Sequence, residues 1–459
     1  MSEVIWSPAE WARAEFGECQ LGDRRRVERA VKYAQQVAAL PNGSTPEQTE
    51  SWADCKAAYR LFDCPDVTFE RLAEPHWKRT RESARGVVLL IDDTTETDYG
   101  RGSHVQGLAA TGNGGGYGYY LHSSLMVDEK TERILGLAGQ EIFLRRPREK
   151  GENTRQRTQR SRPQSEVWGR VISQVGSPAE GVRYIHVCDR GADNLEVFCH
   201  LLQRDCGWVI RASHLTRRVR DEQGASRSLD ELCQRANSLG SFQLPLRETA
   251  THPARIATLE VQVSRVWFPL PKLATPWLKQ TGLGAVGITI LDVREVSPPA
   301  GVPPLRWVLC TDESVTSLAE SQRIIHYYEQ RWLIEEFHKA LKTGCQIESR
   351  QYQTRSRLEA VAGLLSVVAI RLVQLKHAAR ECPTEPAEVR VPREWLEMLR
   401  SLRRRPITTI YDFVRELAGL GGHLGRKSDG DPGWITLWRG LDKLVLALRG
   451  HHARKPKCG

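Results

Sequence analysis

The spacing of hydrophobic residues changes near residue 86 and divides the chain into a helical start and an α/β middle. Before that point the apolar positions repeat with helical spacing, and turn residues interrupt them at 41–43 and 63–65. A Ser-Pro-Ala-Glu capping box at 7–10 marks the first helix. The helices predicted in this part begin near Ser7, Asp23, Pro46 and Thr68, and the third runs over 46–62.

A continuous apolar run at 87–91 comes next, and it is typical of a central strand that is buried on both faces. Two strands joined by a polar turn follow, and then strands alternate with helices. Three neighbouring strands followed by strand–helix units form the order of an RNase H-like fold. The further strands are predicted at 117–127, 134–144, 183–187 and 208–212, and the helices at 165–175 and 194–205.

The rest of the chain contains a β-rich insertion and a helical end. Residues 213–304 are strand-like and punctuated by Pro and Gly, after which a strand at 307–311 and a long helix at 317–342 are predicted. The fold class is therefore α/β, with an RNase H-like core flanked by helical regions. The predicted domains are an all-helical domain at 1–85, a core at 86–375 with its insertion at about 213–304, and a helical region at 376–459.

Composition narrows the class of protein. Lys and Arg number 66 against 56 Asp and Glu, and the net charge of +10 favours a polyanionic partner. The 11 cysteines are scattered without a C-x-x-C pair, which argues for reduced thiols and against a disulfide scaffold or a zinc finger. No secretory signal is visible at the start, and the apolar stretch at 360–370 is too short to span a bilayer. We expect a cytoplasmic protein with no membrane partner.

Acidic residues follow two of the apolar runs. Asp92 and Asp93 come after 87–91, and Asp189 comes after 183–187. Ligands and metals collect at the carboxyl ends of strands in sheets flanked by helices. Neighbours on a strand face opposite ways, so only one of the first two can point at a given site. Taken alone, each motif is better explained as a strand-to-turn exit, where Asp and Thr are common.

The helix near residue 330 favours the site. On an ideal helix, five polar residues fall within an arc of roughly 80°, opposite an apolar face. The residues of this arc are Tyr328, Arg331, Glu335, Lys339 and Lys342. The alternative is a solvated face with an ion pair between Arg331 and Glu335, which are four apart. Glu336 lies outside the arc and is expected on the solvent side.

Three carboxylates and adjacent basic groups suit phosphoryl transfer in DNA. Asp93, Asp189 and Glu335 offer the hard oxygen ligands that Mg²⁺ prefers. Two ions held about 3.5–4 Å apart stabilise the entering and leaving oxygens of an in-line displacement. Arg and Lys beside the third carboxylate would hold phosphates. The hypothesis is a site for two Mg²⁺ ions, in which Mn²⁺ can substitute.

The pattern Tyr328-(2)-Arg331-(3)-Glu335-(6)-Lys342 resembles the Y-R-E-K signature of DDE transposases from bacterial insertion sequences. The sequence is similar to the insertion-sequence-four group, which includes the transposon-five transposase. The motifs at 92–95 and 188–193 resemble the two aspartate motifs of that family, and 21–26 resembles its N-terminal DNA-recognition motif. Segments at 420–423, 433–434 and 437–438 resemble its C-terminal part, so the similarity spans nearly the whole chain.

The resemblance implies an activity and partners. Asp93, Asp189 and Glu335 would be the catalytic metal ligands, and the enzyme would nick transposon ends, form and reopen a hairpin, and join the ends to target DNA. The partners would be double-stranded DNA, as terminal inverted repeats and as target, and a second copy of the chain in a homodimer. The helical domain at 1–85 would then bind DNA, the region at 376–459 would dimerise, and the enzyme would act near the bacterial nucleoid.

The resemblance also marks DNA-contacting positions. Trp307 matches an aromatic residue that stacks on a flipped base, and Arg211 matches a DNA-contacting position; the alternatives are a core tryptophan and a surface arginine. The remaining positions expected to contact DNA are Tyr328, Arg331, Lys339 and Lys342 on the signature helix and Arg25, Arg26 and Arg29 in the N-terminal domain, for which the alternative is a basic solvated face.

A basic loop and two rival functions stay open. The loop at 145–162 carries eight Lys and Arg residues and is either a DNA-tracking segment or a solvated loop. One rival function is an RNase H-like DNA endonuclease that does not join strands. The other is a non-catalytic DNA-binding protein derived from a transposase, against which the intact carboxylates argue.

Overall fold

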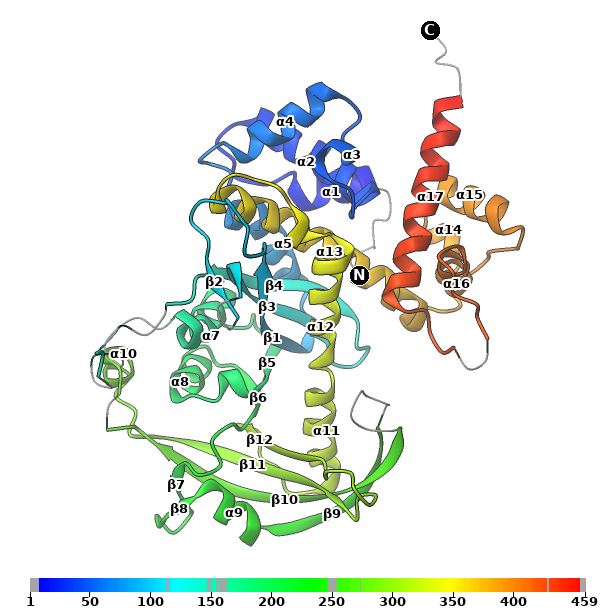
Figure 1. Ribbon diagram of the computed structural model, residues 1–459. Helices are drawn as coiled ribbons and strands as arrows, with labels where there is room; N and C mark the ends of the chain where they lie inside the picture. The colour runs from blue at the N-terminus through cyan, green and yellow to red at the C-terminus, as the bar shows by residue number, and fades with distance from the viewer. Residues whose placement is uncertain are drawn as a thin grey trace.

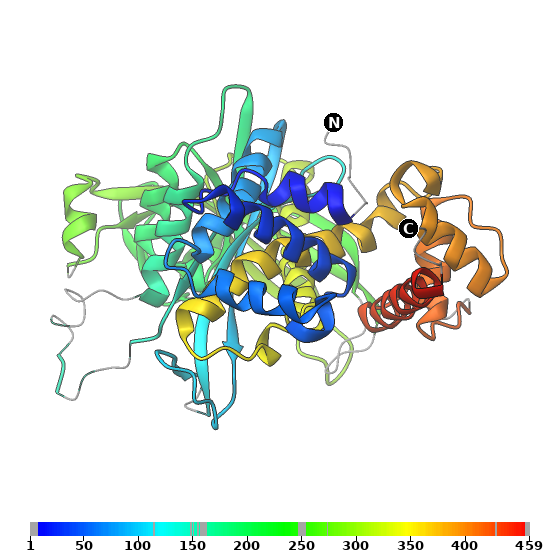
Figure 2. The same cartoon turned by 90° about the horizontal axis from the view of Figure 1, so that it is seen from above.

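The computed structural model describes residues 8–112, 115–146, 149, 151–153, 156, 163–246, 254–272, 274–426 and 429–454. Its middle is a large mixed sheet with helices on both faces, and helical regions lie at both ends of the chain (Figure 1). In two perpendicular views the C-terminal helices lie to one side of the core, whereas the N-terminal helices pack against it (Figures 1 and 2).

Five helices form the N-terminal part, and they end where the sheet begins. The predicted single helix over 46–62 is wrong, because two capping sites divide it. Ser44 and Glu47 form a capping box that starts the first piece, and the Ser51 side chain accepts from the Asp54 N–H to start the second. The helices are α1 (Pro8–Phe16), α2 (Arg24–Ala39), α3 (Thr45–Gln48), α4 (Trp52–Phe62) and α5 (Phe69–Ser83).

The core strands have the arrangement predicted for an RNase H-like fold. Strand β1 pairs antiparallel with β3 and parallel with β5, and β5 pairs parallel with β6. Helices α7 (Pro163–Val175) and α8 (Leu195–Gln203) connect the parallel strands. The core strands are β1 (Gly86–Asp98), β2 (Ala109–Thr111), β3 (Gly116–Asp128), β4 (Ile134–Phe143), β5 (Val182–Cys188), β6 (Gly207–Arg211) and β12 (Arg306–Thr311).

The β-rich insertion extends the core sheet. Its strand β11 pairs with β12, so the sheet runs β2-β3-β1-β5-β6-β12-β11-β10-β7-β8, with β4 beside β3 and β9 beside β10. Two short helices, α9 (Leu229–Arg235) and α10 (Pro276–Gln280), lie within the insertion. Its strands are β7 (Arg218–Arg220), β8 (Ser226–Ser228), β9 (Asn237–Leu246), β10 (Arg255–Pro269) and β11 (Ala285–Val296).

Alternation along the strands separates two apolar layers. Leu89 and Ile91 of β1 belong to a layer that contains Phe337 and residues of the long helix α13 (Arg355–Glu381). Val88 and Leu90 belong to the opposite layer, under α7 and α8. Because successive side chains of a strand point to opposite faces, odd-numbered residues of β1 face the first layer and even-numbered ones the second.

The predicted helix over 317–342 is wrong in its continuity. It consists of α11 (Leu318–Glu329) and α12 (Trp332–Lys339), which follow each other along one direction (Figure 1). Between them the backbone tightens, since the Arg331 N–H donates to the Tyr328 carbonyl three residues back, at 3.1 Å. A π-helical turn, η2 (Ala340–Gly344), and a 3₁₀ turn, η3 (Ile347–Ser349), follow α12.

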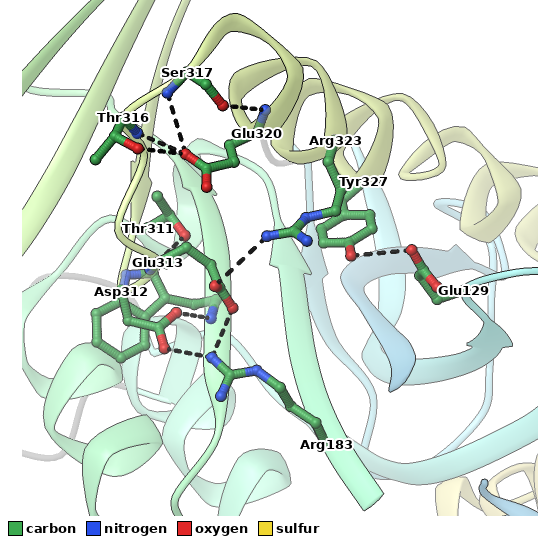
Figure 3. A network of polar contacts seen from close by, with 11 residues as sticks. Glu129, Arg183, Thr311, Asp312, Glu313, Thr316, Ser317, Glu320, Arg323 and Tyr327 are labelled. Carbon is green, nitrogen blue, oxygen red and sulfur yellow. Dashed lines mark hydrogen bonds and ion pairs between the residues drawn. The ribbon is translucent and has the colours of Figure 1, made fainter. Parts of the chain in front are cut away.

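A polar network fixes the start of α11 against the sheet. Ser317 and Glu320 form its capping box, as Figure 3 shows. Beyond it, the Arg183 guanidinium of β5 contacts Asp312 at 3.1 Å and Glu313 at 2.7 Å, just after β12. Further along the helix, the Tyr327 hydroxyl donates to Glu129 at 3.1 Å. These contacts hold α11, and the α12 that continues it, in a fixed position over the sheet.

The longest helix, α13 (Arg355–Glu381), passes through the core and into the C-terminal region. The predicted apolar stretch at 360–370 is only part of α13, and the whole helix is long and apolar enough to cross a membrane. However, 89% of its most apolar 18-residue segment is buried inside the protein. It is therefore a core helix, and the boundary predicted near residue 375 lies within it. The remaining helices are α14 (Ala387–Arg390), α15 (Arg393–Arg403), α16 (Ile410–Leu420) and α17 (Trp434–Arg454).

Candidate active site

Two aspartates lie side by side on neighbouring parallel strands. Asp92 pairs with Cys188 in the register of β1 and β5, so the next positions, Asp93 and Asp189, are adjacent. Both continue the odd-numbered series that faces α12. The prediction that Asp93 ends its strand is wrong, because β1 continues through the threonine-rich segment to Asp98. Asp189 does end its strand, and its Oδ1 accepts the Gly191 N–H at 2.7 Å.

Arg331 joins the third predicted carboxylate to this pair. Its Nη2 donates to Glu335 Oε1 at 2.7 Å, and its Nη1 lies 3.8 Å from Asp93 Oδ2. Glu335 lies in the first turn of α12, one turn after Arg331, so both point at the strand ends. The structure thus brings Glu335 close to Asp93 through Arg331, and Asp189 lies beside Asp93 on the neighbouring strand.

Negative charge is crowded at this place. Burial and the nearby Asp189 raise the pKa of Asp93 to about 6, and Glu335 adds to the effect. The Thr94 N–H, which donates to Asp93 Oδ1 at 2.7 Å, and Arg331 act in the opposite direction. A carboxyl with a raised pKa beside two other acids marks a place where a bound cation would be stabilised.

The donor set fits a divalent metal. Its three carboxylates are the hard ligands of Mg²⁺ or Mn²⁺, and a cation would relieve the repulsion that raises the pKa of Asp93. Within the described part of the chain, no three Asp, Glu, His or Cys side chains are close enough to hold one ion as they stand. The Arg331 guanidinium, bound to Glu335, competes with a metal for that carboxylate.

Asp92 points to the other face of the sheet, as strand alternation predicts. It is 1% exposed, and its Oδ2 lies 2.6 Å from His186 Nδ1 and 3.5 Å from the Cys188 thiol. Burial alone would lower the pKa of His186, but the carboxylate raises it to about 10. This buried pair was not predicted from the sequence. The sequence feature that could have revealed the pair is the even-numbered position of His186 in β5, which places His186 on the same face of the sheet as Asp92.

Two further residues of the predicted site lie on the face of the sheet that carries Asp93 and Asp189. Arg211 comes one residue after the Cys188–Ile210 pairing, so its backbone lies beside Asp189, and its Nη2 donates to a backbone carbonyl at 3.1 Å. Trp307 is half-buried and packs edge-to-face on Tyr328, with ring centroids 5.5 Å apart. This contact fits the alternative of a core tryptophan.

The predicted polar arc is only partly present. Tyr328 is 6% exposed and belongs to the core, because the tightened turn at 330–331 takes it out of line with α12. Lys339 is exposed, and the Lys342 ammonium lies 3.2 Å from Glu348. Trp332, half exposed beside Arg331, lies within the signature motif, but no feature of the sequence assigned it a role.

Glu336 is not on the solvent side, contrary to prediction. Its carboxylate lies 2.6 Å from the Lys376 ammonium and 2.7 Å from His377 Nε2, and its side chain is 13% exposed. Burial alone would raise the pKa of Glu336, but the hydrogen bonds from His377 and Lys376 lower it to about 2. The reason is that α13 covers this side of α12, which no helical wheel of α12 alone can show.

The predicted arginines of α2 divide into two kinds. Arg25 has a 90% exposed side chain that pairs with the neighbouring Asp23 at 2.8 Å, and Arg29 is exposed. Arg26 instead turns inward, where its Nη1 lies 2.6 Å from Asp66 and 2.9 Å from the Leu21 carbonyl. Arg25 and Arg29 are therefore accessible to phosphates, whereas Arg26 holds the start of α2 in place.

Part of the basic loop at 145–162 can be placed. Arg145 and Arg146 are exposed and line a cavity of about 480 Å³ together with Arg170 and Arg355. Arg145 also donates to the Gly112 carbonyl at 2.8 Å. The other predicted basic residues of the loop lie outside the described residues: Arg148, Lys150, Arg155, Arg157, Arg160 and Arg162.

Three family models match the chain, one after the other. They are described as Transposase DNA-binding at residues 8–67, Transposase DDE domain at 155–370 and Transposase Tn5 dimerisation domain at 367–457. Asp189 and Glu335 lie inside the DDE match, and Asp93 precedes it but meets them in space. The DDE match and the carboxylates support an enzyme that acts on DNA, of a class that generally uses divalent metal ions.

The order of the three matches along the chain narrows the class of protein further. A DNA-binding match before the catalytic match and a dimerisation match after it support a DNA transposase that forms dimers. By these matches the chain is similar to DDE transposases of the Tn5 type. The mixed sheet and the helices at both ends agree with that division.

Proposed function

We propose that this chain is a cut-and-paste transposase of the insertion-sequence-four group, with Tyr328, Arg331, Glu335 and Lys342 as its Y-R-E-K signature. The observation that carries the proposal is the proximity of three carboxylates from separate elements: Asp189 lies beside Asp93, and Arg331 links Asp93 to Glu335. A strand pair and the first turn of a helix bring three acidic side chains to the same face of the sheet. The DNA-binding and dimerisation matches at the two ends support the same function.

In this proposal the three carboxylates hold two Mg²⁺ ions, which Mn²⁺ can replace. Bound divalent ions supply charge stabilisation for the entering and leaving oxygens of a phosphodiester displacement. The chain's own groups place the DNA. Arg331, between Asp93 and Glu335, is positioned to exchange a carboxylate for a phosphate oxygen as DNA enters. Arg211, on the same face of the sheet beside Asp189, would hold the backbone next to the reacting phosphate.

The proposed reaction sequence has three stages. Water nicks one strand at a transposon end, the freed 3′-OH attacks the opposite strand to give a hairpin that is reopened, and the 3′-OH then attacks target DNA. Two copies of the chain act on two ends. The proposed site of action is the bacterial cytoplasm, at the nucleoid.

A strand-transfer assay tests this proposal against the endonuclease that only cuts. The substrate is a labelled duplex that carries the inverted repeat flanking the element and ends in a 3′-OH, with a supercoiled plasmid as target. Joined plasmid-length product in Mg²⁺, and none in EDTA, supports a transposase. A second duplex, in which the repeat is still joined to flanking DNA, reports cleavage. If this duplex is cleaved but no joined product forms from the first, the protein is an endonuclease and the proposal is overturned.

A further inference from the structure

One buried arginine connects the DNA-binding helices to the segment that follows the catalytic helix. Arg350 is 6% exposed. Its guanidinium donates to the backbone carbonyls of Pro41 at 2.8 Å and Gly43 at 2.8 Å, and to the Gln48 side chain at 3.2 Å. It also donates to the Cys345 carbonyl at 2.7 Å. A single planar group therefore joins the turn after α2 to the end of η2.

Neighbouring contacts make the same connection through side chains. The Tyr352 hydroxyl lies 3.2 Å from Thr45 Oγ1, at the start of α3. The Tyr352 ring, 7% exposed, packs on Tyr59 and Phe62 of α4 with centroids 5.6 and 5.8 Å apart. The segment around 350–352 is thus seated inside the N-terminal helical group.

From this seat the chain leads back to the active site over a short, irregular path. The α-helix that carries Glu335 ends in the π-helical turn Ala340–Gly344, and Gln346 adopts a left-handed backbone with φ 51°. Single π-helical turns and strained backbone conformations are frequent at functional sites. Within this path, Glu348 accepts the Asp98 N–H at 3.1 Å, at the end of the strand that carries Asp93.

In the other direction, α2 connects Arg350 to the DNA-facing arginines. Arg25 and Arg29 lie in the first turns of α2, and Pro41 and Gly43 follow its last residue. A helix of 16 residues is a stiff rod about 24 Å long at about 1.5 Å per residue. A displacement of its first turns by DNA therefore also displaces the carbonyls that Arg350 contacts.

We infer that Arg350 is a positioning residue that couples engagement of DNA by the N-terminal helices to the placement of Glu335. The inference rests on the proposed function, since it assigns a route by which end binding acts on the catalytic site. The guanidinium has donors in a fixed planar fork, so it cannot follow one partner and keep the others. A buried carbonyl that loses its hydrogen-bond donor lowers the stability of the folded protein. The turn after α2 and the end of η2 share the guanidinium of Arg350 as donor, and they consequently move together.

The test separates DNA binding from chemistry in full-length protein. Arg350→Met keeps the apolar stem and removes every donor. Dissociation constants for a duplex carrying the inverted repeat are measured by fluorescence anisotropy, and nicking rates are measured in single turnovers at saturating DNA and Mg²⁺. We expect binding within about threefold of wild type. We expect nicking about 10–100-fold slower, because small misplacements far from the reacting atoms have effects of this size.

Matched variants exclude a general loss of structure. Arg357 of α13 forms an ion pair with Asp63, at the end of α4, and this pair is more exposed than Arg350. Arg357→Ala removes this contact with the N-terminal helices but leaves the segment from 340 to 350 unchanged. It should retain both binding and nicking. Arg350→Lys, which still donates to some of the carbonyls, should recover part of the nicking rate. If Arg350→Met does not fold, Arg350→Lys and Tyr352→Phe are compared with wild type in the same binding and nicking assays.

Hydrogen exchange gives a direct readout of the coupling. In wild type, the repeat duplex should slow exchange of amides at 340–349, and in Arg350→Met it should not. Equal nicking by both proteins would overturn the inference. So would losses of binding, nicking and melting temperature in parallel, because they indicate a purely structural role. If wild type itself neither binds nor nicks the repeat, the proposed function fails instead, which is a distinct result.

Discussion

At the scale of single residues, two adjacent aspartates have opposite environments. Asp93 shares a partly exposed site with Asp189 and Arg331, whereas Asp92 is enclosed on the other face with His186. The cause is the twofold alternation of a β-strand, which sends neighbours to opposite layers. Asp92 therefore serves the fold, and Asp93 is available for chemistry.

Exchanging each of these aspartates for asparagine should have opposite effects. Asp92→Asn leaves the buried His186 without its anion and should lower the free energy of unfolding by about 3–5 kcal/mol. Assayed well below its melting temperature, it should still nick DNA. Asp93→Asn should melt near the wild-type temperature and show no nicking. Urea unfolding and end cleavage of the two variants check this, and a stable Asp92→Asn or an active Asp93→Asn would contradict the assignment.

At the scale of elements, local pattern predicted the strands well and the helix junctions poorly. The run at 87–91 and the alternation around 183–189 are enough to predict that Asp93 and Asp189 share one face of the sheet. The breaks at 49–51 and 330–331 depend on capping and on a tightened turn, which hydrophobic spacing does not report. The positions of Glu336 and Arg350 depend on α13 and α2, which lie in other segments, so no pattern around either residue contains them.

Helix α2 should contact DNA through its exposed arginines only. Replacing Arg25 and Arg29 together by Ala removes two phosphate contacts and should reduce the slope of log K against log salt by about 1.8, at about 0.9 per contact. Arg26→Ala, which breaks the contact with Asp66, should lower stability and leave that slope unchanged. Anisotropy titrations between low and moderate salt measure the slopes. An unchanged slope in the double variant would remove α2 from the DNA interface.

The packing of α1 on α5 should depend on pH. Burial alone would raise the pKa of Glu15, but His76, Arg79 and Arg371 lower it below its usual value. A depressed carboxyl pKa stabilises the fold above the unfolded pKa, near about 4.3, and this contribution is lost as pH falls through the folded value. Glu15→Gln should therefore cost about 1–3 kcal/mol at pH 7.

Urea unfolding at two pH values checks the Glu15 prediction. The difference between wild type and Glu15→Gln should be largest at pH 7 and should shrink in acid below about pH 4, where the carboxyl becomes protonated. A difference that grows in acid would show that the ionised form of Glu15 does not contribute to the contact between α1 and α5.

At the scale of the whole molecule, the matches to DNA-binding, catalytic and dimerisation models follow one another along the chain. The match for dimerisation covers 367–457, where α16 and α17 cross closely. A Cβ on Gly440 would lie 1.8 Å from the Leu417 carbonyl oxygen, and one on Gly421 would lie 1.8 Å from the Thr436 carbonyl oxygen. Only glycine permits this approach of the two helices.

Gly440→Val should therefore separate dimer formation from end binding. The side chain would push α17 away from α16, while the N-terminal helices and the sheet keep their structure. Light scattering on complexes with the repeat duplex should show one chain on one duplex for the variant, and two chains on two duplexes for wild type. A two-chain complex in the variant would exclude the crossing of α16 and α17 as the basis of the dimer.

We expect Asp93, Asp189 and Glu335 to form one metal-dependent site for cutting and joining DNA. The most direct measurement is cleavage and joining of DNA that carries the flanking inverted repeats, with Mg²⁺ or EDTA. Wild type and the variants Asp93→Asn, Asp189→Asn and Glu335→Gln are compared in the same assay. We predict cut and joined products for wild type in Mg²⁺ alone, and none for the three variants, although each still binds the repeat. Cleavage that survives in any of the three variants, or in EDTA, would show that these carboxylates and a bound metal do not carry out the reaction.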